Sequence, residues 1–194
     1  MSKLDKLIKF SKLLNDFRKV ERALRVHGED RRENDVEHSY QLAMLAWFLA
    51  VETSADLDIN LVIKYAMVHD LVEVYAGDTY AYTTDKSERE SKEKREKDAA
   101  VRLRKEFPEF EELHSLILRY NERGDNESRF VYALDKVHAT LNIYTDGGRT
   151  WREKGITIDM IVGYKKDKIA LSPEIKIYFD ELIELLTREE NKLF

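Results

Sequence analysis

Residues 34–53 read NDVEHSYQLAMLAWFLAVET, and this stretch decides the fold class. Its apolar residues recur every three or four positions, the spacing of one buried helix face: Leu42, Leu45, Ala46 and Leu49. Asn34 is a suitable N-cap, and Glu37 three residues later completes a capping box. Trp47 and Phe48 follow helical spacing as well and are expected in the core. The stretch therefore predicts a helix from residue 34 to about residue 53.

The rest of the chain continues the helical pattern on both sides. Apolar spacing predicts further helices at 3–24, 60–75, 111–121, 127–144 and from 173 onward. Residues 25–33 are expected to form a loop, and residues 149–171 are weakly patterned. Two prolines and seven glycines are too few for the frequent turns of an all-β sandwich. The sequence predicts one all-α domain, a helical bundle spanning 1–194.

A charged segment interrupts this apolar pattern. Twelve of the fourteen residues from Asp85 to Asp98 are charged, six of each sign. Such a run is typical of a solvated helix face, and we interpret 83–98 as a charged helix or a lid segment.

Composition excludes several classes of protein. Lys and Arg number 33 against 38 Asp and Glu, so the net charge of −5 provides no general attraction for nucleic acid or an anionic membrane. Because there is no cysteine, a disulfide scaffold, a thiolate-bound cluster and a cysteine nucleophile are excluded. The N-terminus has no apolar signal core, and no stretch is long enough to span a bilayer. A cytoplasmic protein with neither a nucleic-acid nor a membrane partner is expected.

Chemistry-bearing residues gather at HDLVEVYAGD, residues 69–78. On a helix Glu73 lies four residues after His69 and three after Asp70, so the three side chains can converge on one side. Charged groups among apolar neighbours cost desolvation energy unless something compensates them, and a divalent cation is the simplest compensation. Imidazole and carboxylate suit Co, Mn, Zn, Mg, Ni or Fe, and we expect one such ion whose identity the sequence leaves open.

The remaining ligands of such an ion must come from elsewhere in the chain. His38 in the first turn of its helix is one candidate. Asp135 is another, because it lies in an otherwise apolar helix. A carboxylate there is either exposed on the polar face or engaged by a partner, and periodicity alone leaves both open.

Three separated motifs carry a resemblance to a known family. The sequences EHS at 37–39, HDLVEVYAGD at 69–78 and LDK at 134–136, in this order, resemble the HD-domain metal-dependent phosphohydrolase superfamily, in particular its 5'-deoxynucleotidase-like branch. The likeness covers roughly residues 18–145. It implies a bundle of α-helices and four metal ligands: His38, His69, Asp70 and Asp135.

The resemblance also implies an activity. The enzyme would hydrolyse (deoxy)nucleoside 5'-monophosphates to nucleoside and phosphate through a metal-activated water. Glu73 would position or deprotonate this water, while Asp78 would support it and contact the substrate sugar. An upstream arginine that binds the phosphate in the family is matched by Arg22, with Arg25 as its rival. The usual tryptophan after this arginine is missing.

The sequence leaves other interpretations open. The segment after Asp78, where the family often has proline, is Thr79-Tyr80-Ala81-Tyr82, and Tyr80 and Tyr82 there either stack on a base or pack within the loop. A nucleoside triphosphate or a cyclic or alarmone nucleotide is a second substrate class, for which Arg22, Arg25, Arg31 and Arg32 are available cations. A third alternative is a non-catalytic sensor or interaction domain with a structural metal.

Two further expectations concern assembly and the histidine at position 138. The branch suggests a homodimer, and the apolar positions of the last helix suit either a dimer interface or the core. His138 lies three residues after Asp135 and is expected to support the site from outside or to lie at the surface.

Overall fold

The computed structural model describes residues 2–83 and 85–194. Met1 and Thr84, which fall within the predicted ranges 1–194 and 83–98, lie outside the described residues. The elements follow one another in this order: α1 (Lys3–Phe17), β1 (Glu21–Arg25), β2 (Arg32–Asn34), α2 (Asp35–Glu52), α3 (Ile59–Val68), α4 (Glu73–Ala76), α5 (Lys86–Glu106), α6 (Glu111–Glu122), α7 (Asn126–Thr145), α8 (Arg149–Lys154), α9 (Ile158–Ile169), α10 (Pro173–Arg188) and α11 (Glu190–Leu193). The fold is a single all-α domain with one small hairpin, as predicted.

Helix α2 begins where the sequence predicts. The side chain of Asn34 accepts from the backbone of Val36 and Glu37, and the Glu37 side chain accepts from the Asn34 backbone, which completes the capping box. The prediction for Trp47 and Phe48 was wrong, because these side chains are 48% and 63% exposed. The apolar residues of α2 are spread around its circumference. Its contacts with α3 and α7 therefore decide which of them are buried.

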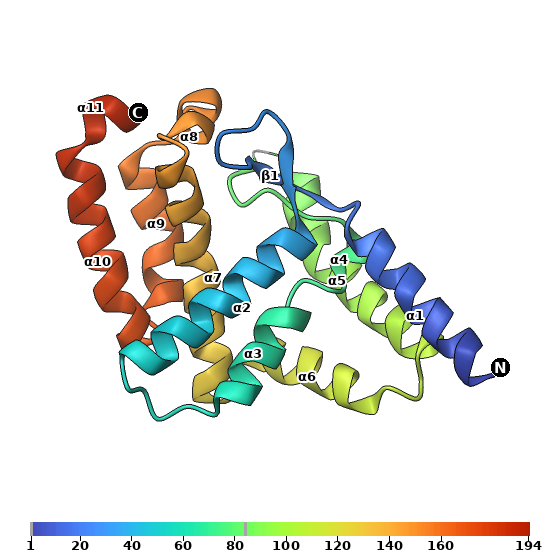
Figure 1. Ribbon diagram of the computed structural model, residues 1–194. Helices are drawn as coiled ribbons and strands as arrows, with labels where there is room; N and C mark the ends of the chain where they lie inside the picture. Colours follow the sequence, from blue (N-terminus) through green and yellow to red (C-terminus); the bar gives the residue numbers. More distant parts are fainter. Residues whose placement is uncertain (1, 84) are drawn as a thin grey trace.

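The predicted helix at 3–24 ends earlier than expected. Helix α1 stops at Phe17, and residues 21–25 form β1, which pairs antiparallel with β2. Local spacing could not reveal this, because the strand is stabilised by a partner on the other side of the loop. Since β2 leads directly into α2, the hairpin lies beside the first turn of that helix (Figure 1). Arg22 of β1 accordingly lies 3.4 Å from Asp35, the first residue of α2.

The predicted helix at 60–75 is broken in the middle. Helix α3 is capped by Asp58 and ends at Val68, and α4 begins only at Glu73. Between them the amide of Leu71 bonds to the carbonyl of Val68 over 3.1 Å, and the amide of Glu73 bonds to that of Asp70 over 2.8 Å. These bonds to the third preceding residue tighten the chain and turn it away from the helix axis.

Two hydrophobic clusters hold the bundle together. The larger one joins α2, α3, α7, α9 and α10, which lie together in Figure 1. The smaller one joins α1, α5 and α6 to the turn that carries Leu71 and Val72. Val68 packs against both clusters, so the break between α3 and α4 lies where they meet. Ile175, Phe179 and Leu182 of α10 belong to the larger cluster, so these positions of the last helix serve the core.

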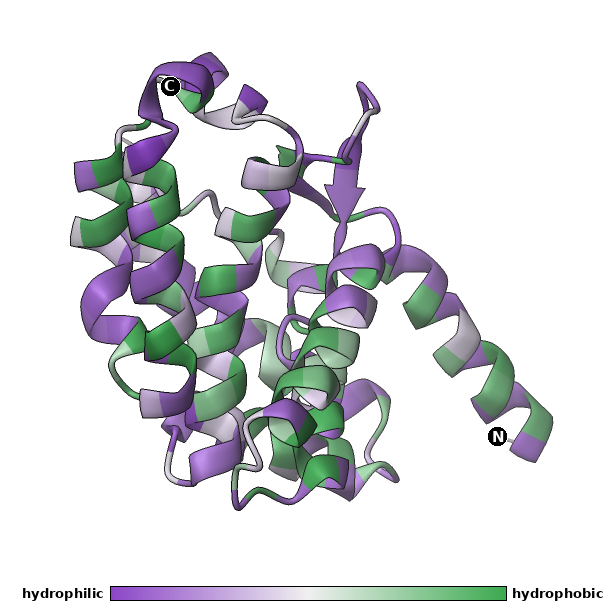
Figure 2. Cartoon of the chain, turned by 60° about the vertical axis from the view of Figure 1, so that its left-hand side comes forward, coloured by the Kyte–Doolittle hydropathy of each residue, from purple (hydrophilic) through white to green (hydrophobic). Residues whose placement is uncertain are grey.

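Three further segments complete the fold. The charged residues from Asp85 to Asp98 cap and form the first half of α5. Residues 149–171, for which the sequence predicts no element, contain α8 and α9. Helix α1 projects from the body with hydrophobic and hydrophilic residues along its length (Figure 2). Among the described residues, no helix combines the length and the apolar character needed to cross a membrane.

Candidate metal centre

The three sequence motifs meet at one point of the fold. His38 comes from α2, His69 and Asp70 from the break after α3, and Asp135 from α7. Ligand atoms of His38, His69 and Asp135 all lie within 4.8 Å of one another. The Oδ2 atom of Asp70 lies 2.9 Å from His69 Nε2 and 3.8 Å from His38 Nε2. The break between α3 and α4 is therefore what turns Asp70 toward the other three side chains.

The ring nitrogens have the arrangement that a cation requires. His69 Nδ1 lies 2.9 Å from the carbonyl oxygen of Ala66, so we assign the proton to Nδ1 and a lone pair to Nε2. Among the described residues His69 Nε2 is buried without a hydrogen-bond partner, although Asp70 is close. His38 Nε2 lies 3.1 Å from Asp135 Oδ1. This donor set of two imidazoles and two carboxylates fits a divalent cation.

Protonation states support this fit. Burial lowers the pKa of His38 to about 4, so its ring is neutral near pH 7. Burial opposes ionisation of Asp135, but Lys136 and His38 outweigh it and hold the pKa of this carboxyl well below its usual range. The pKa of His69 is raised, because Asp70 outweighs the effect of burial. A proton and a metal ion therefore compete for His69.

Glu73 lies beside the four converging side chains. It is 4% exposed, and its Oε2 atom has no hydrogen-bond partner among the described residues. Burial raises the pKa of Glu73 well above its usual value, and the negative charges of Asp70 and Asp78 raise it further. A carboxyl group in such surroundings can hold or accept a proton near neutral pH.

Asp35 is a buried carboxylate that the sequence analysis assigned only to a helix start. It is fully buried, and burial together with the charge of Asp70 raises its pKa to about 7. Its ligand atom lies within 4.8 Å of those of Asp70 and Glu73. The signal that was available is its spacing, since Asp35 is three residues before His38 and so shares a helix face with it.

Arg22, and not Arg25, reaches this cluster. Arg22 Nη1 lies 2.8 Å from Asp70 Oδ2 and 3.4 Å from Asp35 Oδ1. Burial alone would lower its pKa, but Asp70 and Asp135 outweigh burial and raise it. Arg25 instead pairs with Glu153 at 3.0 Å on the surface. The strand β1 separates the two arginines, because residues 22 and 25 point to opposite sides of it.

Asp78 is held at the edge of the cluster by the turn that follows α4. Gly77 ends α4 with a φ of 73°, a conformation that glycine adopts without strain. Arg95 of α5 donates to the carbonyl of Ala76 and to Thr79 Oγ1 at 2.8 Å, which fixes the turn from the other side. Burial raises the pKa of Asp78, opposed by the charge of Arg22.

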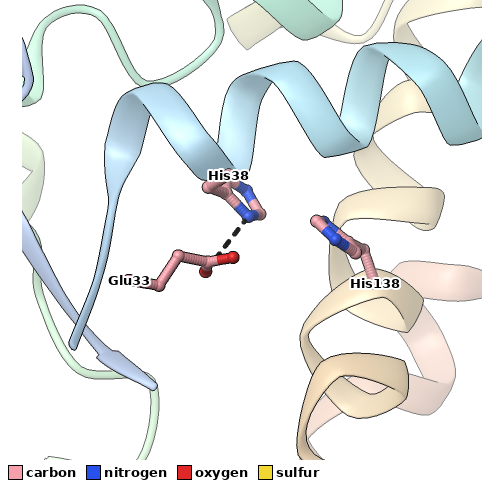
Figure 3. A group of neighbouring side chains, drawn as sticks. All are labelled: Glu33, His38 and His138. Atoms are coloured by element: carbon pink, nitrogen blue, oxygen red, sulfur yellow. Dashed lines mark ion pairs between the residues drawn. The ribbon is translucent and has the colours of Figure 1, made fainter. Parts of the chain in front are cut away.

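A second group of buried side chains lies behind His38 (Figure 3). Glu33 Oε2 is 3.8 Å from His38 Nδ1, and the ring of His138 stacks on that of His38 with centroids 4.9 Å apart and planes 15° apart. Two nearly parallel rings do not aim their in-plane lone pairs at one ion. We therefore interpret Glu33 and His138 as groups that orient His38, a common arrangement around metal-bound histidines. His138 is buried, in agreement with a supporting position.

A cavity opens from the cluster toward α7, α8 and α9. Its lining includes four carboxylates, those of Asp70, Glu73, Asp78 and Asp135. Four cationic side chains also line it: Arg22, Lys92, Lys136 and Lys165. The cavity thus combines the cluster with positive charge, a combination suited to a phosphate-bearing ligand.

Lys165 is a cavity residue that the sequence analysis missed. It is 5% exposed and donates to the carbonyl of Lys136 at 2.7 Å and to Thr140 Oγ1 at 2.6 Å. Burial and the neighbouring charge of Lys136 lower its pKa to about 7. No motif marks this lysine, and it lies in the weakly patterned segment 149–171, so only the packing of α9 on α7 places it here.

Comparisons with known proteins agree with this geometry. The family model described as HD domain matches residues 14–176. A protein of Bos taurus named 5'-deoxynucleotidase HDDC2 is 29% identical over 138 residues, which are 70% of this chain and 65% of the relative. The chain thus spans just under two thirds of the length of that relative. A 5'-deoxynucleotidase HDDC2 of Danio rerio is 27% identical over 73% of this chain and 70% of its own.

Solved structures show the same fold. A predicted metal-dependent phosphohydrolase of Magnetospirillum magnetotacticum superposes with a TM-score of 0.84 at 29% identity, over 97% of this chain and 95% of its own. An HD-domain phosphohydrolase of Listeria innocua shares the fold at 16% identity with a TM-score of 0.60, over 94% of this chain and 86% of its own. Since the family model covers most of the chain, the protein belongs to the HD domain family.

Proposed function

We propose that this protein is a metal-dependent phosphomonoesterase that hydrolyses (deoxy)nucleoside 5'-monophosphates to nucleoside and phosphate. The observation that carries the proposal is the convergence of His38, His69, Asp70 and Asp135 beside a cavity lined by Glu73 and four basic side chains. The names of the 5'-deoxynucleotidase relatives support the substrate class.

Each residue of the site has a role in the proposal. The four converging side chains hold one divalent cation, which when bound polarises a phosphoryl oxygen and lowers the pKa of a water molecule. Glu73 accepts the proton of the attacking water, since its raised pKa and unpartnered Oε2 suit a general base. Arg22 binds the phosphate, and Asp78 contacts the sugar from the mouth of the cavity.

A phosphate-release screen tests this function. The protein is stripped with a chelator and then assayed on nucleoside and deoxynucleoside monophosphates with Co, Mn, Mg, Zn or Ni added singly. We expect no release from the stripped protein and recovery with at least one metal, because ionised carboxylates and neutral imidazoles need the cation to act together. The metal present after purification is identified in parallel. Undiminished phosphate release from the metal-free protein would contradict the proposal.

The alternatives receive less support. Of the four arginines available for a polyphosphate, Arg25 and Arg31 pair with surface carboxylates, and only Arg22 lines the cavity. A release of pyrophosphate in the same screen would nevertheless favour a triphosphate substrate.

A closed structural metal site has no need of an acid/base carboxylate, and the buried Glu73 beside the cavity therefore favours catalysis over a sensor role. The cytoplasmic location remains a prediction.

We propose that the homodimer forms through α2 and not through the last helix. An exposed apolar stripe runs along α2 at helical spacing: Tyr40, Met44, Trp47, Phe48 and Val51. A contiguous apolar patch of this kind marks an interaction site, and a two-fold axis covers the same stripe on both copies.

Light scattering is expected to give twice the mass of one chain. Phe48→Lys should halve the measured mass, whereas Leu118→Lys, at an exposed site on α6, should leave it unchanged. A monomeric parent protein would contradict the interface.

A further inference from the structure

The lining of the cavity beside the metal ligands continues along α7 beyond the charged cluster. Asp135, Ala139 and Ile143 line it at intervals of four residues along one face of α7. Eight residues of helix rise about 12 Å, so the cavity follows α7 over a distance comparable to the length of a nucleotide. Asp135 at one end belongs to the charged cluster. Ile143 belongs to the hydrophobic core, as do Trp151 and Ile156, which also line the cavity.

Three tyrosines from two elements also line this cavity. Tyr80 and Tyr82 come from the turn after Asp78, and Tyr164 comes from α9. The ring of Tyr82 lies 5.7 Å from that of Tyr80 and 5.2 Å from that of Tyr164, measured between centroids. We call these three adjacent rings, whose neighbouring planes are inclined by 62° and 49°, the aromatic wall. Its central member packs against the larger hydrophobic cluster.

Lysine side chains fix the outer rings of this wall. Lys154 lies 5.2 Å from the ring centroid of Tyr80, and Lys168 lies 3.0 Å from that of Tyr164. Each cation covers one face of its ring, an attraction that stabilises the orientation of the ring.

The hydroxyl group of Tyr82 is buried and has no hydrogen-bond partner among the described residues. Burial raises the pKa of Tyr82, with smaller contributions from Tyr80 and Tyr164, so the group is a protonated hydroxyl at neutral pH. A buried hydroxyl without a partner costs free energy, and a polar group of a ligand that reaches the wall would remove this cost.

We propose that Tyr80, Tyr82 and Tyr164 form a subsite for the nucleobase of the substrate. The ligand class is a planar aromatic ring with polar edge groups, joined through a sugar to the phosphate at the metal ligands. This inference rests on the proposed function and extends it, because it makes the base itself a determinant of turnover. Stacking of a base on an aromatic side chain stabilises a complex by about 1–3 kcal/mol.

The test compares a deoxynucleoside 5'-monophosphate with deoxyribose 5-phosphate, which has the same reacting end but no base. We expect the parent enzyme to turn over the nucleotide with a kcat/KM at least tenfold higher. Tyr164→Leu and Tyr82→Leu should each lower kcat/KM for the nucleotide about tenfold, mainly through KM. Neither should change kcat/KM for the base-free phosphate more than twofold, because the metal ligands are untouched.

Two further variants sharpen the comparison. Tyr82→Phe keeps the ring and removes the unpartnered hydroxyl, so it should lower kcat/KM for the nucleotide less than Tyr82→Leu does. Tyr178→Leu, at a partly exposed position of α10 that does not line the cavity, serves as a matched control and should leave both substrates unaffected. Far-ultraviolet circular dichroism checks that each variant is folded.

The outcomes separate the subsite from the proposed function. Equal turnover of the two phosphates by the parent enzyme, or an equal loss on both in the tyrosine variants, would overturn the subsite and leave the phosphatase intact. Absence of turnover on both phosphates under every metal would overturn the proposed function and the subsite with it.

Discussion

Asp70→Asn is expected to lower phosphate release more than about a hundredfold, beyond the ten- to hundredfold loss that follows removal of a partner of a metal ligand. The side chain keeps its size, so the packing around the break after α3 should persist. What disappears is the negative charge at Oδ2, which lies 2.9 Å from His69 and 2.8 Å from Arg22. Arg22 and His69 then lose the carboxylate that they share, and the cation loses a ligand.

Metal content is the measurement that separates this effect from misfolding. After dialysis the parent protein should retain about one equivalent of its metal, and Asp70→Asn should retain far less, with an unchanged circular dichroism spectrum. Asp167→Asn, which alters an exposed carboxylate on α9, is the control and should behave as the parent does. Normal metal content together with normal turnover in Asp70→Asn would remove this residue from the site.

Glu73→Gln should have the second largest effect, a loss of about 10²–10⁴ in kcat, the range ascribed to a general base. The substitution preserves the volume and the buried position of the side chain, which is 4% exposed. It removes only the ability to take up a proton. The metal ligands proposed above do not include Glu73, so metal content should remain close to that of the parent protein.

The comparison of the two variants tests the proposed mechanism. Asp70→Asn should lose metal and turnover together, whereas Glu73→Gln should lose turnover alone. Glu90→Gln, at an exposed position of α5, is the matched control for the second variant. If Glu73→Gln kept more than half of the parental kcat, another group would have to accept the proton. If it lost its metal as well, Glu73 would be a ligand and not a base.

Local patterns predicted much of the helical framework. The capping box at Asn34 and Glu37 formed as expected because both partners lie within one turn. Helices α6 and α7 begin and end within two residues of their predicted limits. The Ser172 side chain accepts from the backbone amide of Ile175 and so caps α10. Pro173 occupies the first turn, where the missing amide hydrogen has no cost.

Predictions failed where a distant partner decides the local structure. The strand β1 exists because β2 pairs with it, and α9 is stabilised by contacts with α7 and α10 more than by its own weak pattern. On α6, His114 is buried and its Nε2 lies 2.8 Å from the carbonyl of Phe107, a residue outside that helix. In these cases the deciding contact joins separate parts of the fold, which the apolar spacing within one element does not show.

The amino-acid sequence by itself determined the helical class, the absence of thiolate chemistry and the imidazoles and carboxylates available to a cation. It did so because helix periodicity, capping and composition are local properties of the chain. Only the tertiary structure decided that Asp70 turns toward His38 and Asp135, that Arg22 rather than Arg25 reaches them, and that Tyr164 and Lys165 line the same cavity. These arrangements depend on where separate helices cross, and that is set by packing among residues far apart in the sequence.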